Sequence, residues 1–237
     1  EFRRVLFRSS AGIDEVFVRP RPKVVIVAVR PDEDQREEIE RRARVNGVEE
    51  VASLDATAAA IESATRALDV DVTVISTDTS SDNELARLLA DAGRGADLVL
   101  TTSDHMVVGQ QDPVSSVLPR MGGTDFARVA MEPGANQGFA LIDPSLVPLV
   151  VLPAGPGPAL ISFMVFVQPL LRKLSGLPPA DVLRAETDRP IARHPDSTTF
   201  VPVRLARVGG RPVLLRAGMG DVTHTIDLSM ADAIAVV

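Results

Sequence analysis

The sequence lacks cysteine, tryptophan and tyrosine, and its eight phenylalanines are the whole of its aromatic content. The absence of cysteine excludes disulfide bonds, thiolate metal ligands and a cysteine nucleophile. The scarcity of aromatic side chains argues against a surface on which nucleic-acid bases stack. Basic residues are outnumbered, 25 against 32 acidic ones, and the formal charge of −7 opposes the counterion release on which nucleic-acid binding depends. We therefore expect no nucleic acid among the partners.

Long apolar runs are absent as well. Pro or Gly interrupts the apolar stretches well short of the ~18 residues that a membrane helix requires, so we expect no membrane span. The three histidines, His105, His194 and His224, are too scattered to suggest a zinc site. Hydrophobic residues nonetheless make up 45% of the 237 residues, which is enough for a sizeable buried core.

The segment from residue 23 to residue 177 alternates between short β-branched runs and helix-like patterns. The pattern predicts strands at residues 23–29, 48–52, 70–76, 96–102, 126–131, 138–142 and 149–152. It predicts helices at residues 31–44, 55–68, 80–92, 113–120 and 158–174, with Phe163, Met164, Phe166 and Val167 packed in the core. Such alternation is typical of the α/β class, and we expect a three-layer, mostly parallel sheet with helices on both faces.

The character of the sequence changes after Leu177, where two prolines follow. Short apolar runs at residues 182–187, 199–208, 211–216 and 233–237 are separated by turn signals such as Gly209-Gly210. This spacing predicts a small antiparallel β domain over residues 178–237, following the α/β domain over residues 23–177.

The chain opens with EFRRVLFRS, which contains three arginines, no starting methionine and no long apolar region of the kind a signal peptide has. Glu-Phe is what an EcoRI site encodes, and Val-Leu-Phe-Arg-Ser resembles a translated sequencing adapter. We expect residues 1–9 to be a non-native leader, with a frayed native terminus as the alternative. Residues 10–22 are then expected to be the end of a preceding domain that is missing.

Three loops are placed where a ligand would bind, because ligands of parallel sheets lie beyond the carboxyl ends of the strands. These loops, at residues 30–34, 101–112 and 153–158, each follow a predicted strand. The last loop, PAGPGP, leads into a predicted helix, and the N–H groups at a helix start form a general site for anions. A purely architectural Gly-Pro turn is the alternative for this loop.

Four segments in order resemble the molybdopterin molybdenumtransferases, the bacterial relatives of the gephyrin E domain. They are VLTTS, VVGQQDPVSSVLPRMG, FARVAMEPG and LPAGPGPALISFMVFVQPLLRKLSG, and the resemblance extends over roughly residues 11–237. The resemblance implies an enzyme of molybdenum cofactor biosynthesis that inserts molybdate into adenylylated molybdopterin (molybdopterin-AMP) and releases AMP. It also implies Mg²⁺ as cofactor, a homodimer and a cytoplasmic location.

The family's motifs also imply roles for individual residues. Glu33 and Asp112 match acidic positions, and the resemblance assigns them to catalysis and to holding the metal. The positions expected to bind the pterin substrate are Ser103, Gly109, Pro133, Gly134, Pro153, Gly155 and Pro156.

Other positions depart from the family's motifs. Glu132 and Ala135 stand where the family has lysines, and Asp104 stands in its glycine pair. Two lost cations and two gained acids change the local charge by about four units, which opposes an anionic pterin. The alternative function is therefore a catalytically degenerate family member that acts as a dimeric scaffold or protein-interaction module. In that case we expect Asp104 and Glu132 to face the cleft beside residues 155–157.

Overall fold

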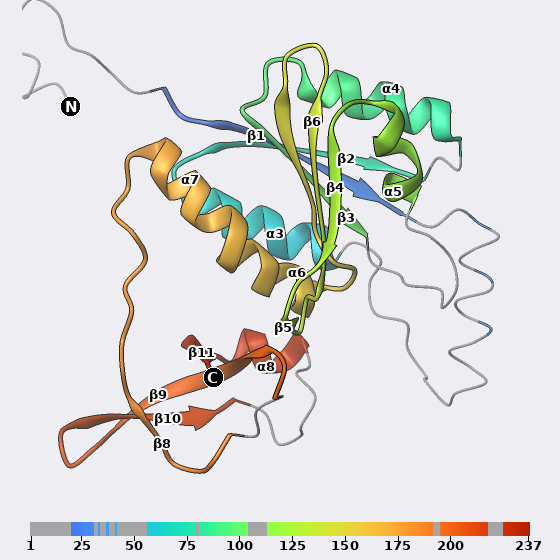
Figure 1. The fold of residues 1–237 in the computed structure, drawn as a ribbon. Helices are drawn as coiled ribbons and strands as arrows, with labels where there is room; N and C mark the ends of the chain where they lie inside the picture. The colour runs from blue at the N-terminus through green and yellow to red at the C-terminus, as the bar shows by residue number, and fades with distance from the viewer. Residues whose placement is uncertain are drawn as a thin grey trace, which may run out of the picture.

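The computed structural model describes residues 20–30, 33, 37, 41, 56–78, 81–103, 113–191, 195–217 and 225–237. The described strands form two sheets, and Figure 1 shows the smaller one below the larger. The predicted leader, the predicted strand at residues 48–52 and most of the predicted helix at residues 31–44 lie outside the described residues. None of the described helices combines the length and the hydrophobicity that a membrane span requires.

Six described strands form the first sheet, in the order β2–β1–β3–β7–β6–β4. Their bounds are β1 Lys23–Val29, β2 Asp71–Thr77, β3 Leu98–Ser103, β4 Thr124–Arg128, β6 Asn136–Ile142 and β7 Val147–Val151. Strands β2, β1, β3 and β7 run parallel to one another, whereas β6 and β4 are antiparallel to their neighbours. The prediction of a mostly parallel sheet is confirmed.

Helices cover both faces of this sheet, as the three-layer prediction requires. One face carries α4 (Asp82–Gly93) and α5 (Pro113–Val117), which is followed by the 3₁₀-helix η1 (Leu118–Arg120). The other face carries α3 (Ala56–Arg66) and a long helix, which runs from α6 (Pro156–Ser162) through the π-helical segment η2 (Phe163–Val167) into α7 (Gln168–Ser175).

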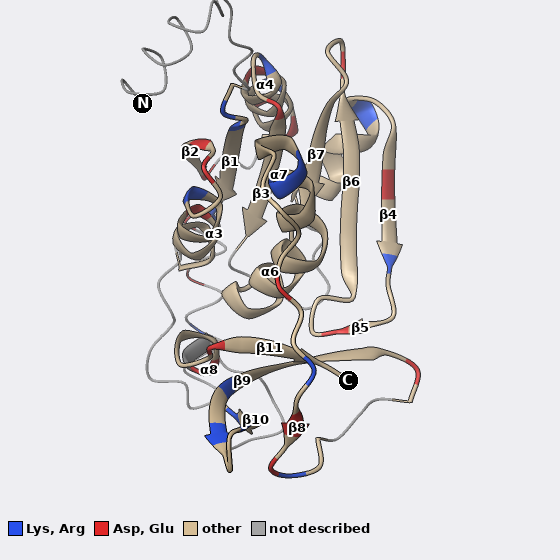
Figure 2. Ribbon diagram, turned by 90° about the vertical axis from the view of Figure 1, so that its left-hand side faces the viewer, with Lys and Arg blue, Asp and Glu red and all other residues tan. Residues whose placement is uncertain are grey.

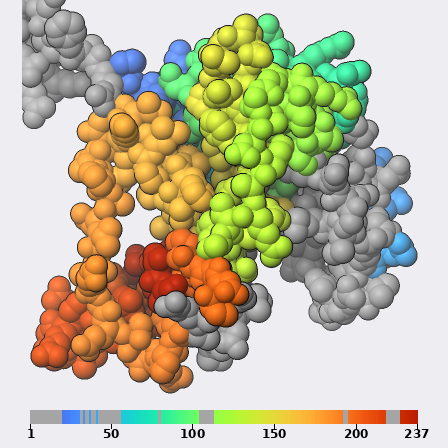
Figure 3. Space-filling model, viewed as in Figure 1, coloured from blue at the N-terminus to red at the C-terminus, as the bar shows by residue number. Residues whose placement is uncertain are grey.

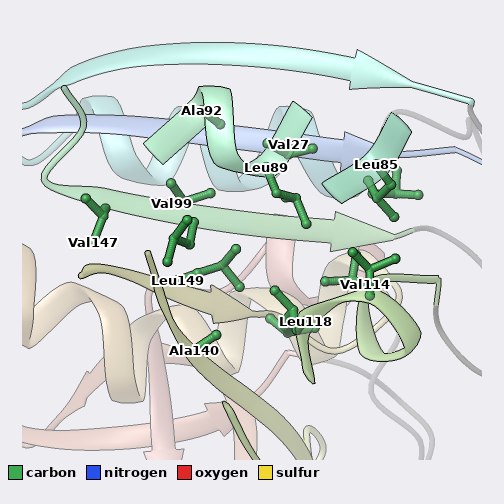
Figure 4. Close-up of a cluster of buried hydrophobic side chains, with 14 residues drawn as sticks. Val27, Leu85, Leu89, Ala92, Val99, Val114, Leu118, Ala140, Val147 and Leu149 are labelled. Carbon is green, nitrogen blue, oxygen red and sulfur yellow. The ribbon is translucent and has the colours of Figure 1, made fainter. Parts of the chain in front are cut away.

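Strand β1 shows how the sequence divides its apolar side chains between these two faces. Successive residues of a strand point to opposite sides. Val27 and Val29 therefore join the cluster with α4 and α5 that Figure 4 shows, while Val24 and Ile26 join the cluster with α3 and the long helix. A strand buried on both faces needs a continuous apolar run, which is what residues 23–29 supply.

The π-helical segment η2 corrects one expectation. Phe163 and Val167 are buried as predicted, but Met164 is 39% exposed and Phe166 is 44% exposed. The long helix contacts the sheet along one side only, and residues one and three positions beyond Phe163 fall outside that side. These two side chains are therefore not part of the core within the described chain.

The second sheet has the order β11–β9–β10–β8. Its strands are β8 Glu186–Thr187, β9 Thr198–Val208, β10 Arg211–Arg216 and β11 Ala233–Val236. Pairs β9–β10 and β9–β11 are antiparallel, and the short β8 is parallel to β10. Gly209 and Gly210 have φ of 57° and 83°, which suits the two-residue turn predicted between β9 and β10.

The two sheets meet at β5 (Met131–Glu132), a separate strand that the sequence pattern did not predict: Met131 was expected to end the strand at residues 126–131 and Glu132 to begin a loop. The chain leaves the first sheet after β4, and Met131 and Glu132 pair in parallel with the start of β9. Behind this pairing, Met131, Ile161 and Phe200 form a buried cluster that also contacts Leu228 of α8 (Thr225–Ser229). Helix α8 was not predicted.

A second connection between the sheets is the exposed linker after α7. The Arg172 guanidinium donates to the Pro178 carbonyl oxygen at 2.6 Å and to that of Pro179 at 3.4 Å, which fixes the direction in which the linker leaves the helix. Val182 is 92% exposed, and Figure 3 shows the linker standing apart from the rest of the molecule.

Candidate functional site

The carboxyl ends of the adjacent parallel strands β3 and β7 bring two of the predicted loops together. The Gly155 N–H donates to the Ser103 carbonyl oxygen at 3.1 Å, and the Leu152 N–H donates to that of Thr101 at 3.0 Å. Ser103 therefore lies beside the loop that contains Pro153, Gly155 and Pro156, and four of the predicted binding positions are neighbours. Parallel pairing with β1 brings the end of that strand, and Arg30 directly after it, to the same edge of the sheet.

The turn into α6 is tight and offers few hydrogen-bond donors. Gly155 precedes the helix with φ of 85° and ψ of 147°, a conformation that residues with a Cβ rarely adopt. Pro156 and Pro158 have no N–H, so Gly157 supplies the sole N–H among the first three helical positions. Helix α6 also has no charged residue, as Figure 2 shows. Attraction of an anion there would depend on one donor and the helix dipole.

The turn that contains Pro133 and Gly134 packs directly against α6. Gly134 has φ of 95°, and a Cβ added to it would lie 2.8 Å from the Ser162 Oγ and 3.4 Å from the Pro158 carbonyl oxygen. The Gln137 side-chain Nε2 donates to the Gly134 carbonyl oxygen at 2.6 Å and to the Ser162 Oγ at 2.6 Å. The structure thus connects the predicted positions Pro133 and Gly134 to the helix that follows the second loop.

Gln137 and Ser162 were not among the predicted residues, although the sequence marks both. Ser162 is a hydroxyl in the apolar run ALISFMVFV, and Gln137 is an amide two residues before the apolar part of β6. A polar side chain within an apolar run is buried at a cost unless it finds a partner. The pattern could therefore have marked each residue as paired, but not with which partner.

Glu132, which the degenerate alternative expects to face the cleft, is exposed at the end of β5. The preceding residue, Met131, packs against Ile161 of α6, and alternation along β5 directs Glu132 to the opposite side, where it is exposed. Asp104, the other residue expected to face the cleft, lies outside the described residues. That both acids face the cleft therefore stays a prediction.

The predicted metal ligands are only partly described. Glu33 is helical and exposed, whereas Asp112 and the predicted binding residue Gly109 lie outside the described residues. Over the part of the chain that the structure describes, no group of three or more His, Asp or Glu side chains is arranged to hold a metal ion. The pairing of Glu33 with Asp112 at a metal ion therefore stays a prediction.

A cavity of about 460 Å³ lies where β5 meets the second sheet. It is lined by Ala130, Pro195, Asp196, Ser197, Thr198, Val236 and Val237. None of the predicted binding positions is among these lining residues, so the cavity is separate from the loops described above.

Comparison with known proteins relates the whole arrangement to one family, although no protein-family model matches the chain. Over 187 residues, which are 77% of the chain, it is 30% identical to molybdopterin molybdenumtransferase 1 of Mycobacterium tuberculosis. It is also 37% identical over 81 residues, 34% of the chain, to the molybdopterin molybdenumtransferase of Haemophilus influenzae. The chain belongs to the molybdopterin molybdenumtransferase family. The predicted resemblance to this family is thereby confirmed.

Solved structures of similar fold align with the whole length of the chain. The molybdopterin biosynthesis moeA protein from Pyrococcus horikoshii has a TM-score of 0.64 at 18% identity and covers 100% of this chain. A molybdenum cofactor biosynthesis protein from Pyrococcus furiosus has a TM-score of 0.62 at 17% identity, with the same coverage. The chain spans 41% of the Mycobacterium relative, 19% of the Haemophilus relative, 55% of the P. horikoshii structure and 69% of the P. furiosus structure.

Proposed function

We propose that this protein acts in molybdenum cofactor biosynthesis as a molybdopterin molybdenumtransferase, which inserts molybdate into adenylylated molybdopterin and releases AMP. The observation that carries the proposal is the 30% identity over 187 residues to a relative of that name. The scaffold alternative is not favoured by any observation on the described residues.

In this proposal the meeting loops after β3 and β7 bind the pterin substrate. Gly155 allows the backbone to approach a phosphate closely, because no Cβ stands in the way. The Gly157 N–H and the dipole of the long helix attract the phosphate oxygens, and Pro133 with Gly134 forms the opposite wall. Ser103 ties the end of β3 to this turn through its carbonyl oxygen.

The finer points of the proposal come from the motifs. We propose Mg²⁺ as cofactor, with Glu33 and Asp112 as its carboxylate ligands, since hard divalent cations prefer oxygen ligands. Gly109 would belong to the pterin-binding positions. A homodimer in the cytoplasm completes the proposal.

The test measures AMP release and uses two matched glycine variants. The full-length native protein is incubated with adenylylated molybdopterin, and AMP release is followed with and without molybdate. We expect molybdate-dependent release, and a loss of about tenfold in Gly155→Ala, because a Cβ at positive φ strains the turn by roughly 1–2 kcal/mol. Gly210→Ala is the control, because Gly210 has φ of 83° with open space around it and lies in the β9–β10 turn.

Complementation adds an independent readout in cells. The full-length native gene should restore molybdoenzyme activity to a strain that lacks the transferase, and the Gly155→Ala gene should restore less. A stably expressed protein that neither releases AMP nor complements would refute the proposal.

A further inference from the structure

A partly buried amide–hydroxyl pair connects the turn at Pro133 and Gly134 to α6, the helix that follows the loop after β7. Ser162 is fully buried in α6, and Gln137 reaches it from β6, 25 residues away in the sequence. An amide nitrogen has two N–H groups, and here one donates to the Ser162 Oγ and the other to the Gly134 carbonyl oxygen. Both donors of Gln137 are therefore used within the protein.

The contact that this pair maintains is close. A Cβ at Gly134 would approach the Met131 Cε to 3.4 Å and the Ser162 Oγ to 2.8 Å, so the turn lies directly on the helix surface. Without Gln137, the Gly134 carbonyl and the Ser162 hydroxyl would each lose a donor in a partly buried place. Unpaired polar groups in such places cost stability, so the turn would move toward water.

We propose that Gln137 is a positioning residue of the transferase site, which holds the turn at Pro133 and Gly134 at a fixed distance from the start of α6. The inference depends on the proposed function, because it concerns the separation of the two loops that would bind adenylylated molybdopterin. Both N–H groups of Gln137 bind the protein and are therefore not available to the substrate. Its effect is on binding, through the Gly134 turn.

The experiment compares Gln137→Leu, Ser162→Ala and the double variant in the full-length protein. KM and kcat for AMP release are measured alongside the dissociation constant of adenylylated molybdopterin and the melting temperature. We expect Gln137→Leu to raise KM and the dissociation constant about tenfold with kcat nearly unchanged, the combined effect of losing the hydrogen bonds to Gly134 and Ser162. Ser162→Ala should give a smaller increase in the same direction, and the double variant should resemble Gln137→Leu, because Gln137→Leu already removes the bond to Ser162.

Asn136→Ala is the matched control, because it removes an exposed amide from the neighbouring position of β6 and should leave KM unchanged. A merely structural brace would lower the melting temperature and the active fraction without changing KM or the dissociation constant, and that result overturns the proposal. If Gln137→Leu does not fold, Ser162→Ala alone decides, through the same change in KM. An unmodified protein that neither binds nor turns over the substrate would instead overturn the proposed function, and with it this inference.

Discussion

Two prolines at the start of α6 withhold backbone donors at the place where the proposed site needs them. A helix start usually offers several unpaired N–H groups to an anion. In this chain Pro156 and Pro158 reduce that number, and Gly157 alone keeps its N–H among the first three positions. In the proposed site, the missing N–H groups of these prolines should therefore weaken phosphate binding.

Pro158→Ser should strengthen AMP binding. The serine adds one N–H and one hydroxyl to the first turn of α6, and a hydrogen bond to a charged phosphate is worth about 1.5–3 kcal/mol, or roughly tenfold or more in affinity. Calorimetric titration with AMP measures the change. Pro119→Ser, an exposed proline in η1, is the control for proline removal as such. Equal AMP affinity in the Pro158→Ser variant and the unmodified protein would contradict the assigned place of the phosphate.

At the scale of elements, the antiparallel edge of the first sheet depends on a residue without a side chain. Gly138 of β6 pairs with Phe126 of β4 on one side and with Val151 of β7 on the other. A Cβ there would lie 2.6 Å from the Phe126 Cε1 and 2.9 Å from the Val151 Cβ. The Phe126 ring thus covers the space that a side chain at position 138 would fill.

Gly138→Ala should destabilise the protein by about 1–3 kcal/mol, the usual cost of inserting a methyl group into a filled space. Urea unfolding measures it as a lower midpoint at unchanged slope. Gly123→Ala is the control, since nothing lies within 4 Å of a Cβ at Gly123. If both variants unfold at the same midpoint, the packing of Phe126 over β6 is not as the structure has it.

Elements were predictable from the sequence where apolar runs are long and bounded. The strands at residues 23–29 and 211–216 agree with the structure to the residue, because Pro or Gly stands close outside them. The two-residue β5 and the five-residue α8 are too short to show a period, and their positions depend on packing against β9 and α6. Likewise, the parallel sheet predicted that the loops after β3 and β7 lie side by side. The hydrogen bond from Gln137 to Ser162 could not be predicted, because it joins residues 25 positions apart that only the tertiary structure brings together.

At the scale of the whole molecule, the cluster of Met131, Ile161 and Phe200 joins the two sheets. Ile161 is fully buried in the long helix that packs on the first sheet, whereas Phe200 lies in β9 of the second sheet. Removal of buried apolar atoms from this cluster should therefore lower the stability of both sheets.

Ile161→Ala should lower the free energy of unfolding by about 2–5 kcal/mol, as buried isoleucine truncations do. It should also speed amide hydrogen exchange in β9, although the substitution is in α6. Hydrogen exchange followed by mass spectrometry tests both parts. Leu205→Ala, at a 45% exposed position of β9, should change either quantity little. Faster exchange confined to α6 would show that the two sheets are stabilised independently.

The path of the chain through β5 limits where chimeras of related sequences can be joined. Between β4 and β6 the chain crosses to the second sheet and returns, so this sheet contains a strand from a segment far upstream of its other strands. A crossover at the proline pair after Leu177 would divide the sequence where its composition changes, yet Met131 and Phe200 would then come from different parents and their contact would join unmatched segments. Chimeras of this family should therefore exchange residues 129–135 together with residues 178–237. The reason is that β5 packs with the second sheet in space although it precedes β6 and β7 of the first sheet in the sequence.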